Sequence, residues 1–184
     1  MLTEVRLRDG SLGLTCALIP EDRQRLAEAY DLLSPESKFD RFLTGVPHLS
    51  DAMLDRLVDG VDGVDHVALV LVVIDDPGVG TPAGVGRLIR YPDDPTAADV
   101  AVNVGEEFRG RGVATALLKE LLAQRPVGVE TFRTVVSADN RAALAMLRPL
   151  GELDIDDAGD RYDVTVVLPP HSPGTGRSAG PRRP

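Results

Sequence analysis

Apolar side chains recur at helical spacing along several parts of the chain. Within residues 113–124, Val113, Leu117 and Leu121 follow one another at intervals of about one turn. Such a row predicts an amphipathic helix. Similar rows predict four further helices, and three of these open beside a proline or serine that favours a helix start. These three helices begin at Pro20, Ser34 and Ser50. The fourth covers residues 139–150.

Other segments have the patterns of strands. Residues 67–74 form an apolar run that is too short for the roughly 20 residues of a membrane-spanning helix, so they predict a buried strand. Residues 98–104 alternate, as in a strand whose two faces meet different surroundings. One face would carry Val100, Val102 and Val104, and the other Asp99, Ala101 and Asn103. Further strands are predicted at residues 4–8, 12–18, 83–91, 131–137 and 161–168. This order, with hairpins in its middle, predicts the α/β (α+β) class with a mixed central sheet.

The composition divides the chain into a body and a tail. Its 184 residues suffice for one domain with a substantial core. Residues 169–184 are rich in proline and glycine and almost without apolar side chains, so we predict a disordered tail after a domain at residues 1–168. The whole chain has 20 basic and 29 acidic residues, a net charge of −9. Because the tail holds three arginines and no acid, the domain itself carries −12.

These numbers exclude several classes of function. A strongly acidic protein is a poor binder of nucleic acid or of an anionic membrane, so neither is expected as a partner. The single cysteine, Cys16, cannot form an internal disulfide, and the three histidines have no metal-ligand spacing, so no metal is expected. The first ten residues lack the pattern of a signal peptide, and we expect a cytoplasmic protein.

Residues 105–115 carry the candidate chemistry. They connect the alternating strand to the helix at 113–124, and a helix N-terminus presents free N–H groups and a partial positive charge. Gly110 and Gly112 would let a phosphate approach those groups, and Arg109 and Arg111 would add positive charge. The segment predicts a phosphate or pyrophosphate site, although it lacks the lysine of a P-loop and the third glycine of a dinucleotide fingerprint. A merely flexible connection is the alternative.

The chain resembles the GNAT superfamily of acyl-CoA-dependent N-acetyltransferases over about residues 3–168. The signature of that family, Arg/Gln-x-x-Gly-x-Gly/Ala, is matched by residues 109–114, and its second element, a strand followed by Asn and a helix, is matched by residues 137–151. The segments VRLRDG and LLSPESKFDRF further resemble sequences of the bacterial branch that acetylates protein lysines. The resemblance implies the GNAT fold, a mixed, mostly antiparallel sheet with splayed central strands and flanking helices.

The resemblance also implies an activity and a set of binding residues. The activity is transfer of an acetyl group from acetyl-CoA, as cosubstrate, to a primary amine by direct attack in a ternary complex. The acceptor would be a protein lysine or a small amine. The resemblance leaves open whether the chain forms a homodimer. The residues implied for the cofactor are Val102, Asn103 and Val104 along the pantetheine, Arg109, Gly110, Arg111, Gly112, Val113, Ala114 and Thr115 at the pyrophosphate, and Asn140 near the pantetheine or the thioester.

Asp99 is the candidate catalytic base. The acceptor amine must be neutral to attack, so a base must take its proton, directly or through water. Asp99 stands at the head of the key strand, where members of the branch usually have Glu, and its shorter side chain favours a bridging water. The alternatives are that Asp99 is a solvated residue after the turn at 92–95, or that Glu106 or Glu107 is the base, although both are expected on the loop surface.

Leu147 departs from the family pattern. Many members have a tyrosine seven residues after the Asn, which acts as the general acid, and this chain has Leu147 there. Leu147 and the Asp in place of Glu motivate a function of another class, a non-catalytic acyl-CoA-binding or regulatory module. The acidic clusters at residues 51–65 and 152–163 are usually solvated faces, and the resemblance would place them beside a cationic acceptor.

Overall fold

The computed structural model describes residues 2–35, 38, 46–76 and 78–170. Most of the helix predicted from Ser34 and residues 171–184 of the predicted tail lie outside the described residues. The strands are β1 (Leu2–Arg6), β2 (Leu12–Ala17), β3 (His66–Asp76), β4 (Val79–Arg90), β5 (Ala97–Val104), β6 (Thr131–Ser137), β7 (Glu152–Asp157) and β8 (Arg161–Val167). The helices are α1 (Arg23–Asp31), α3 (Asp51–Leu54), α4 (Val113–Ala123) and α5 (Arg141–Leu147). Single helical turns add η1 (Pro20–Asp22), η2 (Asp55–Asp59), η3 (Glu106–Phe108) and η4 (Arg148–Leu150).

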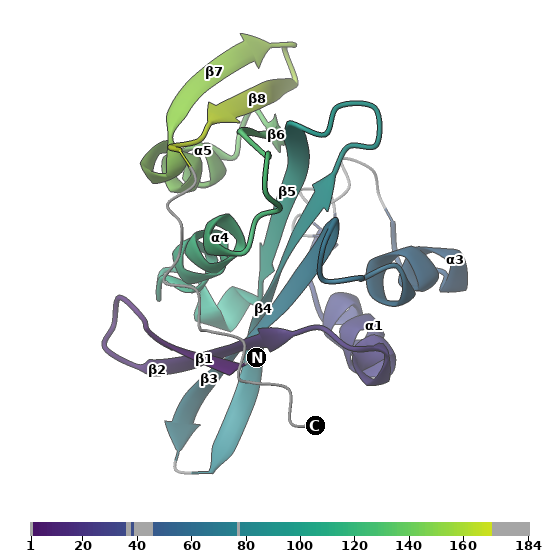
Figure 1. Cartoon of the computed structure of the whole chain (residues 1–184). Helices are drawn as coiled ribbons and strands as arrows, with labels where there is room; N and C mark the ends of the chain where they lie inside the picture. The colour runs from purple at the N-terminus through teal and green to yellow at the C-terminus, as the bar shows by residue number, and fades with distance from the viewer. Residues whose placement is uncertain (1, 36–37, 39–45, 77, 171–184) are drawn as a thin grey trace, which may run out of the picture.

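All eight strands form one sheet in the order β1-β2-β3-β4-β5-β6-β8-β7. Every neighbouring pair is antiparallel except β5 and β6, which run parallel in the middle of the sheet. This confirms the mixed, mostly antiparallel sheet. Helices α4 and α5 cover one face, and α1 and α3 lie on the other (Figure 1).

The two faces of β3 supply two separate cores. Leu69, Leu71 and Val73 join the main cluster, to which α4 contributes Leu117 and Leu121 among others. Ala68 belongs to a smaller cluster on the α1 side, with Leu18 and Val58. A strand buried on both faces has no polar positions to alternate with, which is why the run at 67–74 appears uniformly apolar in the sequence.

Close approach of α4 to the sheet depends on two glycines of β4. A Cβ at Gly84 would lie 2.8 Å from the Asn103 carbonyl oxygen and 3.0 Å from Val113. A Cβ at Gly86 would lie 3.0 Å from Leu121 and 3.2 Å from Leu117. These glycines therefore let the helix that follows the candidate phosphate loop sit directly on β4.

Two parts of the fold differ from the sequence-based expectation. Strand β7 was not predicted from the sequence. Its apolar residues Leu153 and Ile155 alternate with acidic side chains, which are rare in strands and therefore hide the strand pattern. The helix predicted at 139–150 is α-helical only over Arg141–Leu147 and ends in the turn η4, which contains Pro149. Proline cannot donate the backbone hydrogen bond that would continue the helix, as the sequence indicated.

Candidate active site

The two central strands separate after only three paired positions. Ala97, Ala98 and Asp99 of β5 lie opposite residues 131–133 of β6. Beyond them, among the described residues, β5 continues to Val104 and β6 to Ser137 without pairing with each other. The edge of β5 at residues 100–104 that faces β6 therefore offers its backbone N–H and C=O groups to water or to an extended ligand. This is the splayed geometry that the family resemblance implies.

The side chains of β5 point alternately to the two faces of the sheet, as predicted. Val100 is buried in the main core, and Val102 and Val104 pack against that core. Ala101 and Asn103 line a pocket on the opposite face. Any ligand that pairs with the free edge of β5 thus has the core under α4 on one side and this pocket on the other.

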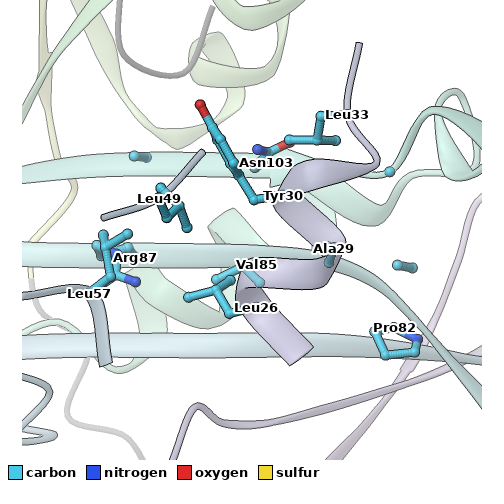
Figure 2. A pocket seen from close by; sticks show the side chains of 14 residues that line it. Leu26, Ala29, Tyr30, Leu33, Leu49, Leu57, Pro82, Val85, Arg87 and Asn103 are labelled. Atoms are coloured by element: carbon cyan, nitrogen blue, oxygen red, sulfur yellow. The ribbon is translucent and has the colours of Figure 1, made fainter. Parts of the chain in front are cut away.

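The pocket has a volume of about 120 Å³ and is mostly apolar (Figure 2). Leu26, Ala29 and Tyr30 of α1 form one wall, and Val85 and Arg87 of β4 belong to the opposite wall. The Tyr30 hydroxyl donates to the Val46 carbonyl oxygen at 2.8 Å, which fixes the ring against the pocket. Polar groups in such a cavity orient a ligand, while the apolar wall excludes water.

Arg87 and His66 form a buried pair that sequence reasoning missed. Arg87 is 4% exposed and its Nη1 donates to His66 Nε2 at 2.5 Å. An arginine only donates, so Nε2 must accept, and the ring proton lies on Nδ1, which donates to the Gly60 carbonyl oxygen at 2.8 Å. Burial, and then the neighbouring Arg87, lower the pKa of His66. These hydrogen bonds hold the His66 ring as the neutral Nδ1–H tautomer, with a structural role at the start of β3.

Asp99 lies at the last paired position of β5, where the strands begin to separate. It is half-buried, and it shares its sheet face with Ala101 and Asn103. Burial raises the pKa of Tyr91, and the carboxylate of Asp99 raises it further. Arg133, opposite Asp99 on β6, lies 5.8 Å from the Tyr91 ring centroid and pairs with Asp94. The predicted base is therefore located at the fork, within a small network of charged and phenolic groups.

The predicted phosphate loop ends at a helix without a side-chain cap. Gly110 and Gly112 both have positive φ, and at Gly112 a Cβ would also meet Arg8 at 3.1 Å. Among the described residues no side chain caps α4 at Gly112, so the N–H groups of the first turn, including Thr115, are not satisfied within the helix. The loop thus has the free donors that an anion requires.

The two predicted loop cations have different surroundings. Arg111 forms ion pairs with Asp9 at 2.6 Å and with Asp75 at 2.7 Å. Hydrogen bonds to these two carboxylates raise the pKa of Arg111 and fasten the loop to the β1–β2 turn and to the end of β3. Arg109 is exposed at the surface. Arg111 therefore has a structural role that the sequence did not suggest, and much of its charge is already balanced.

The remaining predicted residues also have local roles. Asn140 is the N-cap of α5, and its Oδ1 accepts from the Ala143 N–H at 3.0 Å. Leu147 is buried in the main core, so no hydroxyl group is available at that position. The acidic cluster at residues 51–65 is partly paired, since Asp51, Asp55 and Asp59 all contact Arg23.

Neither a membrane-spanning helix nor a metal-binding cluster occurs among the described residues. None of the helices there has the length and apolar character needed to cross a membrane. No group of three or more His, Cys, Asp or Glu side chains in that part of the chain is arranged to hold a metal ion.

Comparison with known proteins agrees with this geometry. The model of the acetyltransferase (GNAT) family matches residues 26–151, more than half of the chain. The chain belongs to the acetyltransferase (GNAT) family. Within this family it is similar to a protein named acetyltransferase PA5475 from Pseudomonas aeruginosa, with 30% identity over 159 residues, 86% of this chain and 84% of that protein. The GNAT fold and the N-acetyltransferase class expected from the sequence are thereby confirmed.

Two further similar proteins carry the name Pat. Acetyltransferase Pat of Mycolicibacterium smegmatis is 28% identical over 165 residues, which cover 89% of this chain and 46% of Pat. The chain therefore spans about half the length of that relative. The crystal structure of the GNAT domain of S. lividans PAT superimposes with a TM-score of 0.79 and 26% identity, covering 91% of this GNAT chain and 97% of that one.

The anchoring of the loop by Asp9 predicts a pH-dependent stability. Hydrogen bonds from Ser11 and then the contact with Arg111 lower the pKa of Asp9 from 3.8 to about 2. A carboxyl group whose pKa is lower in the folded state stabilises the fold above its unfolded pKa, and this contribution is lost as the pH falls toward the folded value. We expect Asp9→Asn to be less stable than wild type in urea at pH 6, with a difference that shrinks below pH 3.8. A difference that stays constant down to pH 3 would contradict this assignment.

Proposed function

We propose that this GNAT enzyme transfers an acetyl group from acetyl-CoA to a primary amine at the fork between β5 and β6. The observation that carries this proposal is the unpaired edge of β5 at residues 100–104, which leads directly into a loop with free helix N–H groups. An extended arm ending in a pyrophosphate matches both features. When bound, acetyl-CoA supplies the thioester that the amine attacks.

The cofactor residues fit this path. The backbone of Val102, Asn103 and Val104 would pair with the pantetheine amides, as a strand pairs with its neighbour. The N–H groups of Val113, Ala114 and Thr115 would hold the pyrophosphate, with Gly110 and Gly112 allowing its approach. Arg109 adds charge at the surface, and Arg111 holds the loop in shape through its two carboxylates. Asn140 would act on the pantetheine or the thioester while capping α5.

Asp99 is proposed as the base. Asp99 takes a proton from the ammonium form of the acceptor, directly or through a water. The lone pair of the neutral amine then attacks the carbonyl carbon, the C–N bond forms as the C–S bond breaks, and the remaining excess proton on nitrogen leaves to the CoA thiolate or to water. The place of Asp99 at the fork, on the sheet face that carries the pocket, supports this role. A thiolate is a weak enough base to leave without a dedicated acid, which is compatible with the buried Leu147.

The acceptor is proposed to approach from the pocket face. Its amine is cationic before deprotonation, and exposed carboxylates of the β7–β8 hairpin, such as Asp154 and Asp156, would attract it. A protein lysine and a small amine are both cationic, so these carboxylates would attract either acceptor. The resemblance of the segments VRLRDG and LLSPESKFDRF to the branch that acetylates protein lysines favours a protein acceptor, whereas the small pocket volume favours a slender alkylamine group in either case.

Leu147 also favours a second candidate function, a module that binds acyl-CoA without turnover, because no tyrosine hydroxyl is present at that position. A panel of amines and lysine peptides incubated with acetyl-CoA, with CoA release as the readout, separates the two. Acceptor-dependent release supports the enzyme, and binding without release on any acceptor supports the module.

A charge placed in the first turn of α4 tests the cofactor site. We expect Thr115→Glu to weaken acetyl-CoA binding about 10-fold or more, measured by isothermal titration calorimetry, because its carboxylate would repel the pyrophosphate. An acidic residue near a helix N-terminus does not harm the helix itself, so the variant should fold. Thr115→Gln is the matched control of equal size, and it should bind much more tightly than Thr115→Glu. Equal affinity of the two variants would contradict the pyrophosphate assignment.

Removal of the proposed base should affect turnover and not binding. We expect Asp99→Asn to lower kcat about 100-fold near neutral pH, with a smaller effect at high pH, where more of the amine is already neutral. Affinity for acetyl-CoA should stay the same, and Asp99→Glu should retain most of the activity. Asp93→Asn, which changes an exposed carboxylate in the turn before β5, is the matched control. Unchanged turnover in Asp99→Asn would remove Asp99 from the mechanism.

A further inference from the structure

Arg133 is the cation that the sheet places next to the proposed base. In the parallel pairing of β5 with β6, Asp99 and Arg133 are direct partners at the last paired position before the strands separate. Residues paired in this way project to the same face of the sheet from strands about 5 Å apart. The long side chain of Arg133 can therefore reach the carboxylate of Asp99.

Asp94, in the turn between β4 and β5, holds this arginine in another place. Arg133 Nη2 donates to Asp94 Oδ2 at 2.5 Å, and its guanidinium carbon lies 5.8 Å from the centroid of the Tyr91 ring. Asp94 is itself fixed, because its Oδ1 accepts from the Thr96 hydroxyl at 2.6 Å and from the Thr96 N–H at 3.2 Å. The Thr96 hydroxyl, and then Arg133, lower the pKa of Asp94, so this carboxylate is charged in neutral solution.

The charged and titratable groups around Asp99, among the described residues, come from three neighbouring elements. They are Arg133 on β6, Asp93 and Asp94 in the turn before β5, and Arg87 and Tyr91 on or just after β4. Arg87 is buried and donates to His66, whereas Arg133 is exposed, with 47% of its side chain accessible. Of the two arginines, Arg133 is therefore the one that can exchange one carboxylate for another without leaving a buried group unsatisfied.

We propose that Asp94 is a positioning residue for the acetyl transfer, because it holds Arg133 away from the carboxylate of Asp99. This inference rests on the proposed function, in which Asp99 is the base. A carboxylate that pairs with a guanidinium group is a weaker base and takes the proton of the acceptor less readily. The ion pair at Asp94 therefore preserves the basicity of Asp99.

A double-mutant cycle tests this role. Asp94→Asn keeps an oxygen that can accept from Thr96 but removes the charge that binds Arg133. We expect kcat near neutral pH to fall about 5-fold or more, with unchanged affinity for acetyl-CoA, because Arg133 then pairs with Asp99. In an Arg133→Gln background, the same Asp94→Asn change should alter kcat by no more than about 2-fold. A merely structural role of Asp94 in the turn would lower kcat equally in both backgrounds, and that result would overturn the proposal.

A titration of the cofactor-free protein gives a second readout. The side-chain carboxyl signal of Asp99 in carbon NMR can be assigned by its loss in Asp99→Asn. In Asp94→Asn this signal should titrate at lower pH than in wild type, and adding Arg133→Gln should reverse the shift. Asp93→Asn removes the neighbouring exposed charge without touching Arg133, so as the matched control it should move the midpoint much less. Equal shifts in Asp93→Asn and Asp94→Asn would overturn the proposal.

Failure of this inference and failure of the proposed base are distinguishable. Unchanged turnover in Asp99→Asn overturns Asp99 as the base and this inference with it. Loss of turnover in Asp99→Asn, together with wild-type turnover in Asp94→Asn, overturns only the role of Asp94. If Arg133→Gln alone loses as much activity as Asp99→Asn, Arg133 takes part directly and the proposal is also overturned. If Asp94→Asn does not fold, Asp94→Ser, which keeps an oxygen for Thr96, is used with the same expected results.

Discussion

The separation of β5 from β6 after Asp99 is the constraint on which the rest of the site depends. Strands inside a sheet normally satisfy their backbone groups on both sides, and unpaired buried groups cost free energy. Here only three parallel positions join the two halves of the sheet, and β5 then continues for five residues paired with β4 but not with β6. Such an edge is stable when water or a ligand completes its hydrogen bonds. Helix α4 rests on β4 through Gly84 and Gly86, so the loop that precedes this helix is held at the end of the open edge.

Charge is distributed unevenly around this fork. The chain is acidic overall, and its carboxylates serve partly as structural partners of arginines, as Arg23 and Arg111 show. The cations near α4 divide into two kinds, since Arg111 is balanced by Asp9 and Asp75 while Arg8 and Lys119 have no carboxylate partner among the described residues. An acidic surface around these local cations fits an anionic cofactor on one side of the sheet and a cationic amine on the other.

Local patterns were sufficient to predict most elements and the loop. The alternation of β5, the apolar row of α4 and the glycines at 110 and 112 are readable from neighbouring residues, and the structure confirms each of them. The contacts that the sequence did not reveal join distant segments. Arg111 meets Asp9 across 102 positions, and Arg87 meets His66 across 21. Such pairs depend on the order of strands in the sheet, which no local period encodes.

Hydrogen–deuterium exchange with and without acetyl-CoA tests the central claim most directly. If the free edge of β5 and the first turn of α4 form the cofactor site, ligand binding should slow exchange at residues 100–104 and 112–115. Amides of β2 and β3, which are paired on both sides in the free protein, should change little. Protection confined to other segments, with β5 unchanged at saturating ligand, would show that the open edge does not hold the cofactor.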